Sequence, residues 1–240
     1  MTPVYTIRHS PLLAGVDAAL AQRMAIAMTE ESWPLGAQIM GPHDSVERFR
    51  IIVSGRVKIV SSNSHSGREL TLWLLGAGDG FDIVSLLDGK PHAVSAWALT
   101  PVHSVAAPQS AWAEWMQHSA ALELAVHRYV GGKLRELTAL ATDLAVHDTV
   151  TRLSHLLLRH FDGSRPNLLR DLPQSELAAM IGSVRVVLSR ALTHLREAGV
   201  VGLHRGAIDS VDLKRLLARA ETEAAHRAPR TTGAPGERRS

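Results

Sequence analysis

The sequence predicts an α+β fold with an N-terminal antiparallel β-roll of the jelly-roll type, a long helix and a C-terminal winged helix-turn-helix. Three observations predict it. Glycine and proline recur at turn-like intervals between residues 33 and 108, as they do between short strands. Apolar residues then repeat at steps of three and four across residues 119–145. Residues 172–211 show two short helical segments followed by a hairpin pattern.

The composition is that of an ordinary globular chain. Its 240 residues are 45% hydrophobic and 20% charged, which suits one large domain or two small ones. Cysteine is absent, which excludes disulfides, thiolate metal sites and iron–sulfur clusters. Met1 to His9 contain no long apolar run, and no segment approaches the roughly 20 apolar residues of a membrane span. We therefore expect a cytoplasmic protein that does not contact membranes.

Residues 1–117 are predicted to form a β-rich sensor domain after a short helix at Ala18–Met28. Short apolar or alternating runs lie between the turn residues, and they are Phe49–Val53, Val57–Val60, Leu70–Leu75 and Ala93–Leu99. Several short strands at this spacing are typical of an antiparallel barrel, roll or sandwich.

Residues 118–146 are predicted to form one long helix with an apolar stripe. The stripe consists of Leu122, Val126, Val130, Leu134, Leu137, Ala141 and Leu144. Gly131 and Gly132 interrupt it, and each lowers helix stability by about 1 kcal/mol. Two interpretations stay open. The helix belongs to the core, or it forms a homodimer seam in which the glycines allow close approach or a bend.

Residues 147–220 are predicted to form a separate helical domain that contains a helix-turn-helix. Its first helix lies within Leu172–Gly182, and the terminal glycine readily adopts a positive φ. Ser183 is the expected N-cap of the second helix, Val184–Leu195. The residues expected to pack the two helices together are Leu177, Ile181, Leu188, Leu192 and Leu195. Such a pair places its second helix in the major groove of DNA, whereas the alternative is a helical hairpin within a bundle.

A basic hairpin favours the DNA-binding interpretation. Gly199–Leu203 and Ala207–Ile208 are predicted to flank a tip at residues 204–206, as in a wing. Residues 147–220 carry 11 Lys/Arg against 7 Asp/Glu, a balance of +4 that attracts phosphates. Arg bonds guanine bidentately, and Ser and Gln reach phosphates or base edges. The candidate contacts to double-stranded DNA are Gln174, Ser175, Ser183, Val184, Arg185, Val186, Ser189, Arg190 and Arg205. Residues 221–240 are expected to be a disordered tail.

With these parts in order, the chain resembles the CRP/FNR superfamily of bacterial transcription regulators from residue 9 to about residue 217. Ile52–Ile59 resembles the hairpin of that family's cyclic-nucleotide-type β-roll. Gly78–Phe81 and Ser85–Pro91 resemble its effector cassette. The resemblance implies an allosteric homodimer that binds a palindromic DNA site, contacts RNA polymerase and responds to a small molecule. An enzyme is not expected, because the sequence contains no nucleophile elbow, phosphate-cradling loop or paired catalytic carboxylates.

The cassette departs from the cyclic-AMP-binding members of the family. They carry Gly-Glu-Leu after the cassette Phe, and Arg before a small residue near its end. Here these positions read Asp82-Ile83-Val84 and His92-Ala93. An apolar Ile83 would leave the ribose hydroxyl unpaired, at about 1–3 kcal/mol, so we expect an effector other than cyclic AMP. The candidate effector pocket comprises Trp73, Phe81, Asp82, Ile83, Val84, Ser85, His92, Ala93 and Lys133.

The chain resembles the nitrogen-regulator branch of the family, which binds 2-oxoglutarate, more closely than the cyclic-AMP-binding members. Gly182–Val186 matches the pattern of its reading helix and implies a half-site nearer to GTA than to TGTGA. Lys133 and His92 fall near the places of its ligand-binding basic residues. The alternative is that Lys133 is a solvated helix residue.

Two other modes of regulation stay open. A haem-based sensor of nitric oxide or carbon monoxide would use Trp73 and Trp97 to line its pocket and His92 or His127 as ligand. An effector-independent regulator would have a filled pocket, with the tryptophans in the core. Among the 13 histidines we find no convincing pair at i, i+4 with a carboxylate, so we expect no metal site.

Overall fold

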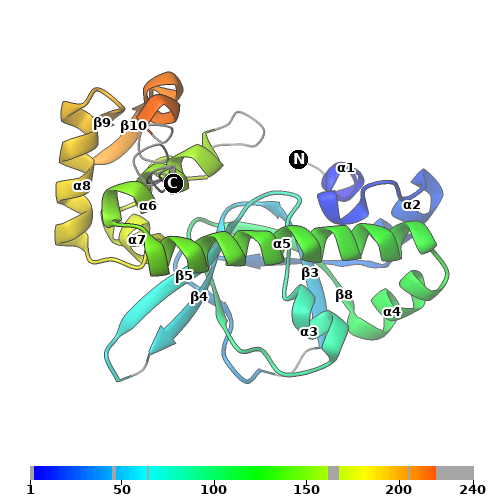
Figure 1. Ribbon diagram of the computed structural model, residues 1–240. Coiled ribbons are helices and arrows are strands. Elements are labelled where there is room, and N and C mark those ends of the chain that lie inside the picture. Colours follow the sequence, from blue (N-terminus) through cyan, green and yellow to red (C-terminus); the bar gives the residue numbers. More distant parts are fainter. Residues whose placement is uncertain (1–2, 45–46, 64, 162–167, 205, 220–240) are drawn as a thin grey trace, which may run out of the picture.

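The computed structural model describes residues 3–44, 47–63, 65–161, 168–204 and 206–219. Two helices precede the strands, α1 (Pro3–His9) and α2 (Ala18–Ala27). The predicted helix at residues 18–28 is confirmed, and it begins where the Asp17 carboxylate accepts a 2.8 Å hydrogen bond from the Leu20 amide. Both helices lie at the end of the molecule opposite the C-terminal helices (Figure 1).

The β-rich part folds into two four-stranded antiparallel sheets, as predicted. One sheet has the order β1 (Thr29–Trp33), β8 (Val102–Pro108), β3 (Arg48–Ser54), β6 (Gly80–Phe81). The other has the order β2 (Gln38–Met40), β7 (Ser95–Ala98), β4 (Val57–Asn63), β5 (Arg68–Leu75). Most neighbouring strands are distant in sequence, which is the connectivity of a roll. Ile51, Ile52 and Val57 are fully buried in its interior.

A short helix, α3 (Ile83–Asp88), lies inside the segment that the sequence indicated to be entirely β. Asp82 precedes it at φ 69° and Gly89 follows it at φ 67°. These two left-handed residues turn the chain into and out of the helix between β6 and β7. Six residues are too few to show a helical period, which is why the pattern missed it.

The long helix α5 (Ala120–Val146) follows a short helix, α4 (Gln109–Gln117). It begins at Ser119, whose hydroxyl accepts a hydrogen bond from the Leu122 amide, and it continues through Gly131 and Gly132. In Figure 1 it runs past the β-roll from α4 to the C-terminal helices. Leu122, Val126 and Tyr129 are buried against the roll in one cluster with Phe49 and Trp112. The first half of the predicted stripe is therefore core. The second half of α5 also runs along the roll, because Leu137 and Leu140 line cavities together with residues of β5.

The C-terminal part is a winged helix-turn-helix, as predicted. Its helices are α6 (Thr149–His160), α7 (Gln174–Met180) and α8 (Arg185–Glu197). The hairpin of β9 (Val201–His204) and β10 (Ala207–Val211) follows α8. Only His147 and Asp148 separate α5 from α6, and the Asp148 carboxylate caps α6 through a 2.9 Å bond from the Thr151 amide.

The predicted wing residue Arg205 and the predicted tail at residues 221–240 lie outside the described residues. Within the described ranges, no helix combines the length and the apolar character that a membrane crossing requires.

Candidate functional site

The two helices of the helix-turn-helix meet through a buried apolar contact. The five leucine and isoleucine side chains predicted to join them are all at most 2% exposed: Leu177, Ile181, Leu188, Leu192 and Leu195. Gly182 makes the turn at φ 59°, and a Cβ there would lie 2.4 Å from Leu144 of α5. The positive φ favours glycine at the turn, and a larger residue would also have to displace the Leu144 side chain.

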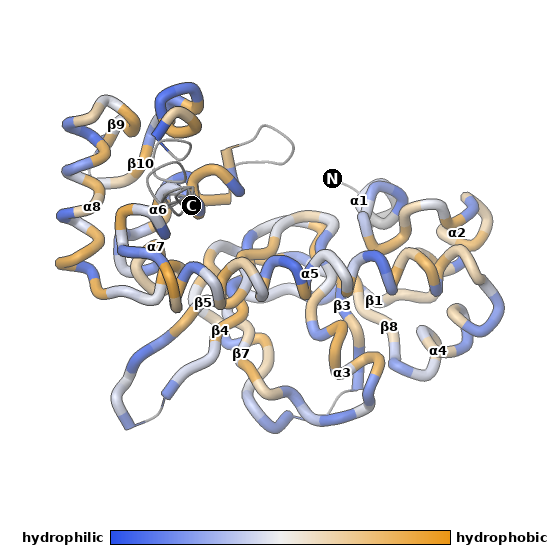
Figure 2. The backbone as a smooth tube through the Cα atoms, in the orientation of Figure 1, coloured by the Kyte–Doolittle hydropathy of each residue, from blue (hydrophilic) through white to orange (hydrophobic). Residues whose placement is uncertain are grey.

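The outer face of α8 is free of intramolecular cover. Arg185, Ser189 and Arg190 are exposed, so the prediction that they point outward is confirmed. Val184 and Val186 are 54% and 64% exposed. Figure 2 shows the tube of α8 alternating between hydrophobic and hydrophilic residues, at the outer edge of the molecule. Basic and apolar side chains together at one helix start can bond guanine edges and contact thymine methyl groups.

The predicted N-cap of α8 is wrong. The N-cap residue is Val184, and no side chain accepts a hydrogen bond from the first turn. Ser183 lies one position earlier because its amide closes the turn on the Ala178 carbonyl at 2.9 Å. The first amides of α8 therefore have no side-chain cap, and such amides favour an anion.

The other predicted DNA contacts lie on α7. Ser175 is exposed, whereas Gln174 donates a 3.0 Å hydrogen bond from Nε2 to the Gly206 carbonyl in the turn of the wing. Gln174 therefore joins the wing to α7.

A cavity of about 420 Å³ lies between the β-roll and α5. Eight of the nine predicted pocket residues line it: Trp73, Phe81, Asp82, Ile83, Val84, Ser85, Ala93 and Lys133. Helix α5 also contributes Tyr129, Val130, Leu134 and Leu137. The walls are mainly apolar, and the charged groups among them are the cations of Lys133 and Lys90 and the carboxylates of Asp82 and Asp88. Trp97, which was considered for a haem pocket, is not among the lining residues.

Comparison with known proteins identifies this architecture. The chain matches the family models of the cyclic nucleotide-binding domain at residues 30–119 and of the Crp-like helix-turn-helix domain at residues 151–219. It is 31% identical over 189 residues to a global nitrogen regulator of Synechococcus elongatus, with 74% of this chain and 83% of the relative covered. The chain belongs to the CRP/FNR superfamily. It is thus a DNA-binding transcription regulator and not an enzyme.

Other CRP/FNR proteins cover still more of the chain. A CRP-like cAMP-activated global transcriptional regulator of Mycobacterium tuberculosis is 26% identical over 220 residues, which are 89% of this chain and 98% of the relative. The structure of FixK2 from Bradyrhizobium japonicum superposes with a TM-score of 0.71 at 20% identity, over 80% of this chain and 96% of that one. At 20% identity, the similarity to the FixK2 structure shows that the two chains share a fold.

The cassette of this CRP/FNR chain contains a buried pair, Asp82 and His92. His92 Nδ1 lies 2.6 Å from Asp82 Oδ2 and 3.4 Å from the Ser85 hydroxyl. His92 is only 4% exposed and is not among the residues that line the cavity. Burial raises the pKa of the Asp82 carboxyl, while Ser85 and His92 counteract the rise. Because Asp82 also begins α3, the pair anchors the cassette helix.

Lys133 lies where α5 meets the cassette. Its side chain is 12% exposed, so it is not a solvated helix residue. Its Nζ lies 3.1 Å from Glu136 Oε2 and 5.4 Å from the centroid of the Tyr129 ring. Lys133 also lines a second cavity of about 320 Å³, which β5 and α6 help to form. It therefore contacts both the effector cavity and the junction with the DNA-binding part.

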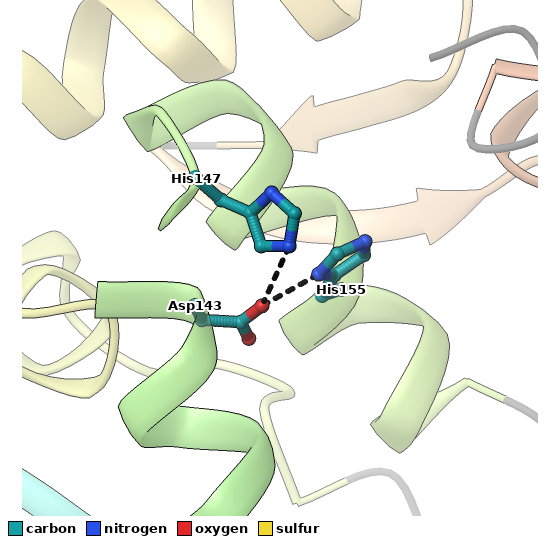
Figure 3. A group of neighbouring side chains, drawn as sticks. All are labelled: Asp143, His147 and His155. Carbon is teal, nitrogen blue, oxygen red and sulfur yellow. Dashed lines mark hydrogen bonds and ion pairs between the residues drawn. The ribbon is translucent and has the colours of Figure 1, made fainter. Parts of the chain in front are cut away.

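Two further features were missed by the sequence analysis. The Lys58 ammonium lies 3.0 Å from both carboxylate oxygens of Glu176 on α7, a pair 118 residues apart for which the sequence contains no pattern. At the junction of α5 and α6, the Asp143 carboxylate lies close to the imidazoles of His147 and His155 (Figure 3). Here a pattern exists, because Asp143 and His147 are four residues apart.

Proposed function

We propose that the protein is a dimeric, sequence-specific transcription regulator whose DNA affinity is set by a small anionic effector other than cyclic AMP. The observation that carries this proposal is the cavity between the β-roll and α5, in which Lys133 provides a cation. Ile83 also lines it, at the position that the sequence resemblance assigns to the ribose-binding Glu of cyclic-AMP-binding members. An effector there would contact both the sensor cassette and the helix that leads to the DNA-binding part.

Dimerisation through α5 is supported by a stripe of mostly exposed residues along the helix, of which Leu134 also borders the cavity. The stripe repeats at alternating steps of three and four: Leu124, His127, Gly131, Leu134, Thr138, Ala141 and Ala145. Such a 3.5-residue repeat of apolar and small residues fits a coiled-coil seam. Leu124 and Leu134 are 48% and 63% exposed in the single chain. The proposed seam is this stripe, which shares Leu134 and Ala141 with the stripe expected from the sequence and differs at the other positions.

The two helix glycines support the same seam. A Cβ at Gly131 or Gly132 would meet no atom within 4 Å, so nothing in the single chain requires glycine there. Each glycine nevertheless lowers helix stability by about 1 kcal/mol. A second α5 helix passing close to Gly131 would explain why glycine is present there despite this loss of helix stability.

DNA recognition is assigned to the exposed start of α8. Arg185 and Arg190 would bond base edges, while Val184 and Val186 would contact thymine methyl groups. Ser175, Ser183 and Ser189 would bond phosphates or base edges. Gln174 would act indirectly, since it orients the wing. In a dimer the two α8 helices would read half-sites about 34 Å apart, and RNA polymerase would bind the promoter-bound dimer.

The chemistry of the effector follows from the lining of the cavity. Apolar walls favour a compact carbon skeleton, and Lys133 favours a carboxylate or phosphate that competes with Glu136. 2-Oxoglutarate has this chemistry. A haem is less well supported, because none of the described histidines lines the cavity: His92 faces Asp82, and His127 lies on the exposed stripe of α5. A cavity of this size also argues against a filled pocket and an effector-independent regulator.

One experiment tests the proposal. Sites selected by the purified protein from a random DNA pool are expected to be palindromes with half-sites one helical turn apart. Affinity for the best site is then measured with 2-oxoglutarate, cyclic AMP or haem added separately. A response to 2-oxoglutarate alone supports the proposed effector class, and a response to cyclic AMP contradicts it. If no sequence is enriched, the assignment of α8 to base reading fails.

A further inference from the structure

The junction between α5 and α6 gathers three groups that commonly bind metal ions. Asp143 lies in the last turn of α5, His147 in the two-residue connection, and His155 on α6. Asp143 Oδ1 lies 2.7 Å from His155 Nδ1 and 4.0 Å from His147 Nε2. All three ligand atoms lie within 4.8 Å of one another. Figure 3 shows both imidazoles directed at the same carboxylate oxygen.

We propose that Asp143, His147 and His155 bind one divalent transition-metal cation, of which Zn²⁺ is the representative. Two imidazole nitrogens and one carboxylate oxygen form a three-residue zinc site that leaves the fourth position to water. Imidazole ligands favour Zn²⁺, Co²⁺ or Ni²⁺ over Mg²⁺ and Ca²⁺, which prefer oxygen ligands.

The geometry needs only side-chain adjustment. Bonds of about 2.0 Å in a tetrahedron separate neighbouring ligand atoms by about 3.3 Å. The His155 nitrogen would therefore move away from Asp143 Oδ1, and the His147 nitrogen would move toward it, each by less than about 1 Å. Both rings are partly exposed, at 17% for His147 and 30% for His155, and they pack edge to face with their centroids 5.0 Å apart.

Arg159 completes the surroundings of the carboxylate. Its Nη1 lies 3.0 Å from Asp143 Oδ2, the oxygen that the imidazoles do not approach. An outer hydrogen bond of this kind fixes the orientation of a ligand and leaves the other oxygen for the cation. The four side chains line a shallow depression of about 450 Å³, through which a hydrated ion can enter.

Binding at this position would join the long helix to the DNA-binding part. The ligands come from α5, from the connection and from α6, so one cation would restrict the angle between the two helices. Since α6 packs with α8 in one core, the angle sets the position of α8. This regulatory consequence rests on the proposed function, whereas binding of the metal does not.

The test uses the full-length, tag-free and metal-free protein, titrated calorimetrically with Zn²⁺. We expect one Zn²⁺ per chain, with at least ten-fold weaker binding in His147→Gln and in His155→Gln. His118→Gln is the matched control, because His118 is exposed at the end of α4 and far from the junction in sequence. Titration with Co²⁺ should give the intense visible absorption of a tetrahedral site, and Mg²⁺ should not displace Zn²⁺.

Three results would overturn the proposal: no Zn²⁺ binding by the wild-type protein, equal binding by all three histidine variants, or no visible band with Co²⁺. The Asp143–His155 and Asp143–Arg159 contacts tie the helices together without a metal, so thermal unfolding of each metal-free variant verifies that it folds. DNA affinity with and without Zn²⁺ is measured separately. If the protein binds Zn²⁺ but no DNA sequence, the metal site stands and the proposed function fails.

Discussion

The Lys58 ammonium lies 3.0 Å from both carboxylate oxygens of Glu176, and this contact joins strand β4 of the roll to the first helix of the helix-turn-helix. The two side chains are only 12% and 19% exposed, so salt screens their attraction less than that of an open surface pair. Arg56 adds a 3.0 Å hydrogen bond from Nη1 to the Leu168 carbonyl. Polar contacts that water or an anion can replace thus hold the DNA-binding part against the β-roll, together with the packing of Leu74 and Leu99 on its core.

We expect the Lys58–Glu176 pair to contribute about 1 kcal/mol, at the upper end of the range for partly exposed pairs. A double-mutant cycle with Lys58→Met and Glu176→Gln, measured by urea unfolding, gives this coupling directly. Lys90→Met is the control, because Lys90 is 79% exposed and should change stability by less than about 0.5 kcal/mol. A coupling near zero would show that the pair does not hold the two parts together.

Arg185→Ala should weaken binding to the selected DNA site by about 1–3 kcal/mol, or roughly 5- to 150-fold, and should relax the preference at one base position. Arg196→Ala, in the last turn of the same helix, is the control and should retain the preference. Competition assays with single-base variants of the site measure both effects. An equal loss on every sequence would mean that Arg185 binds phosphate rather than a base.

Leu134→Glu should dissociate the dimer, since it places a charge in the middle of the proposed seam. Ala121→Glu adds the same charge to an exposed position of α5 outside the stripe and should leave the dimer intact. Sedimentation velocity at micromolar concentration distinguishes the two. A dimeric Leu134→Glu protein would require another interface.

Lys133→Met should abolish the effect of an anionic effector on DNA affinity, because the apolar side chain cannot pair with a carboxylate. Affinity without effector is measured in parallel, because Lys133 also lines the cavity at the junction with α6 and a change there would not depend on the effector. Glu136→Gln is the second variant. It removes the carboxylate that competes with the effector for Lys133, so it should tighten effector binding. The measurement is DNA affinity as a function of effector concentration, and an unchanged response in Lys133→Met would place the anion elsewhere.

Asp82 should make stability depend on pH. Burial raises the pKa of its carboxyl in the folded state, so the folded chain retains this proton at pH values where the unfolded chain has lost it. The stabilisation that Asp82 gives through this retained proton is therefore fully present below its ordinary pKa of 3.8. It is lost as the pH rises through the raised pKa of the folded state. The difference in unfolding free energy between the wild type and Asp82→Asn should fall over that interval. Asp88→Asn is the exposed control, and parallel curves for the wild type and Asp82→Asn would contradict the assignment.

The repeated patterns of the sequence determined most of the architecture. Strands such as β3 and β5, the helix α5 and the pair α7–α8 were predictable because alternation and helical periods are properties of neighbouring residues. Gly182 and the exposed arginines of α8 were predictable for the same reason. Helix α3 was missed because its six residues make fewer than two helical turns, too few for a helical period to repeat.

Only the tertiary structure decided which groups meet. It turned His92 toward Asp82 instead of the cavity, placed Leu122 and Val126 of the predicted stripe in the core, and left Leu124, which was not predicted, exposed beside Leu134. The Lys58–Glu176 contact and the group of Asp143, His147 and His155 also arise only in the folded chain. The physical reason is that each depends on how elements pack together, and a sequence pattern specifies the face that a residue occupies without specifying what covers that face.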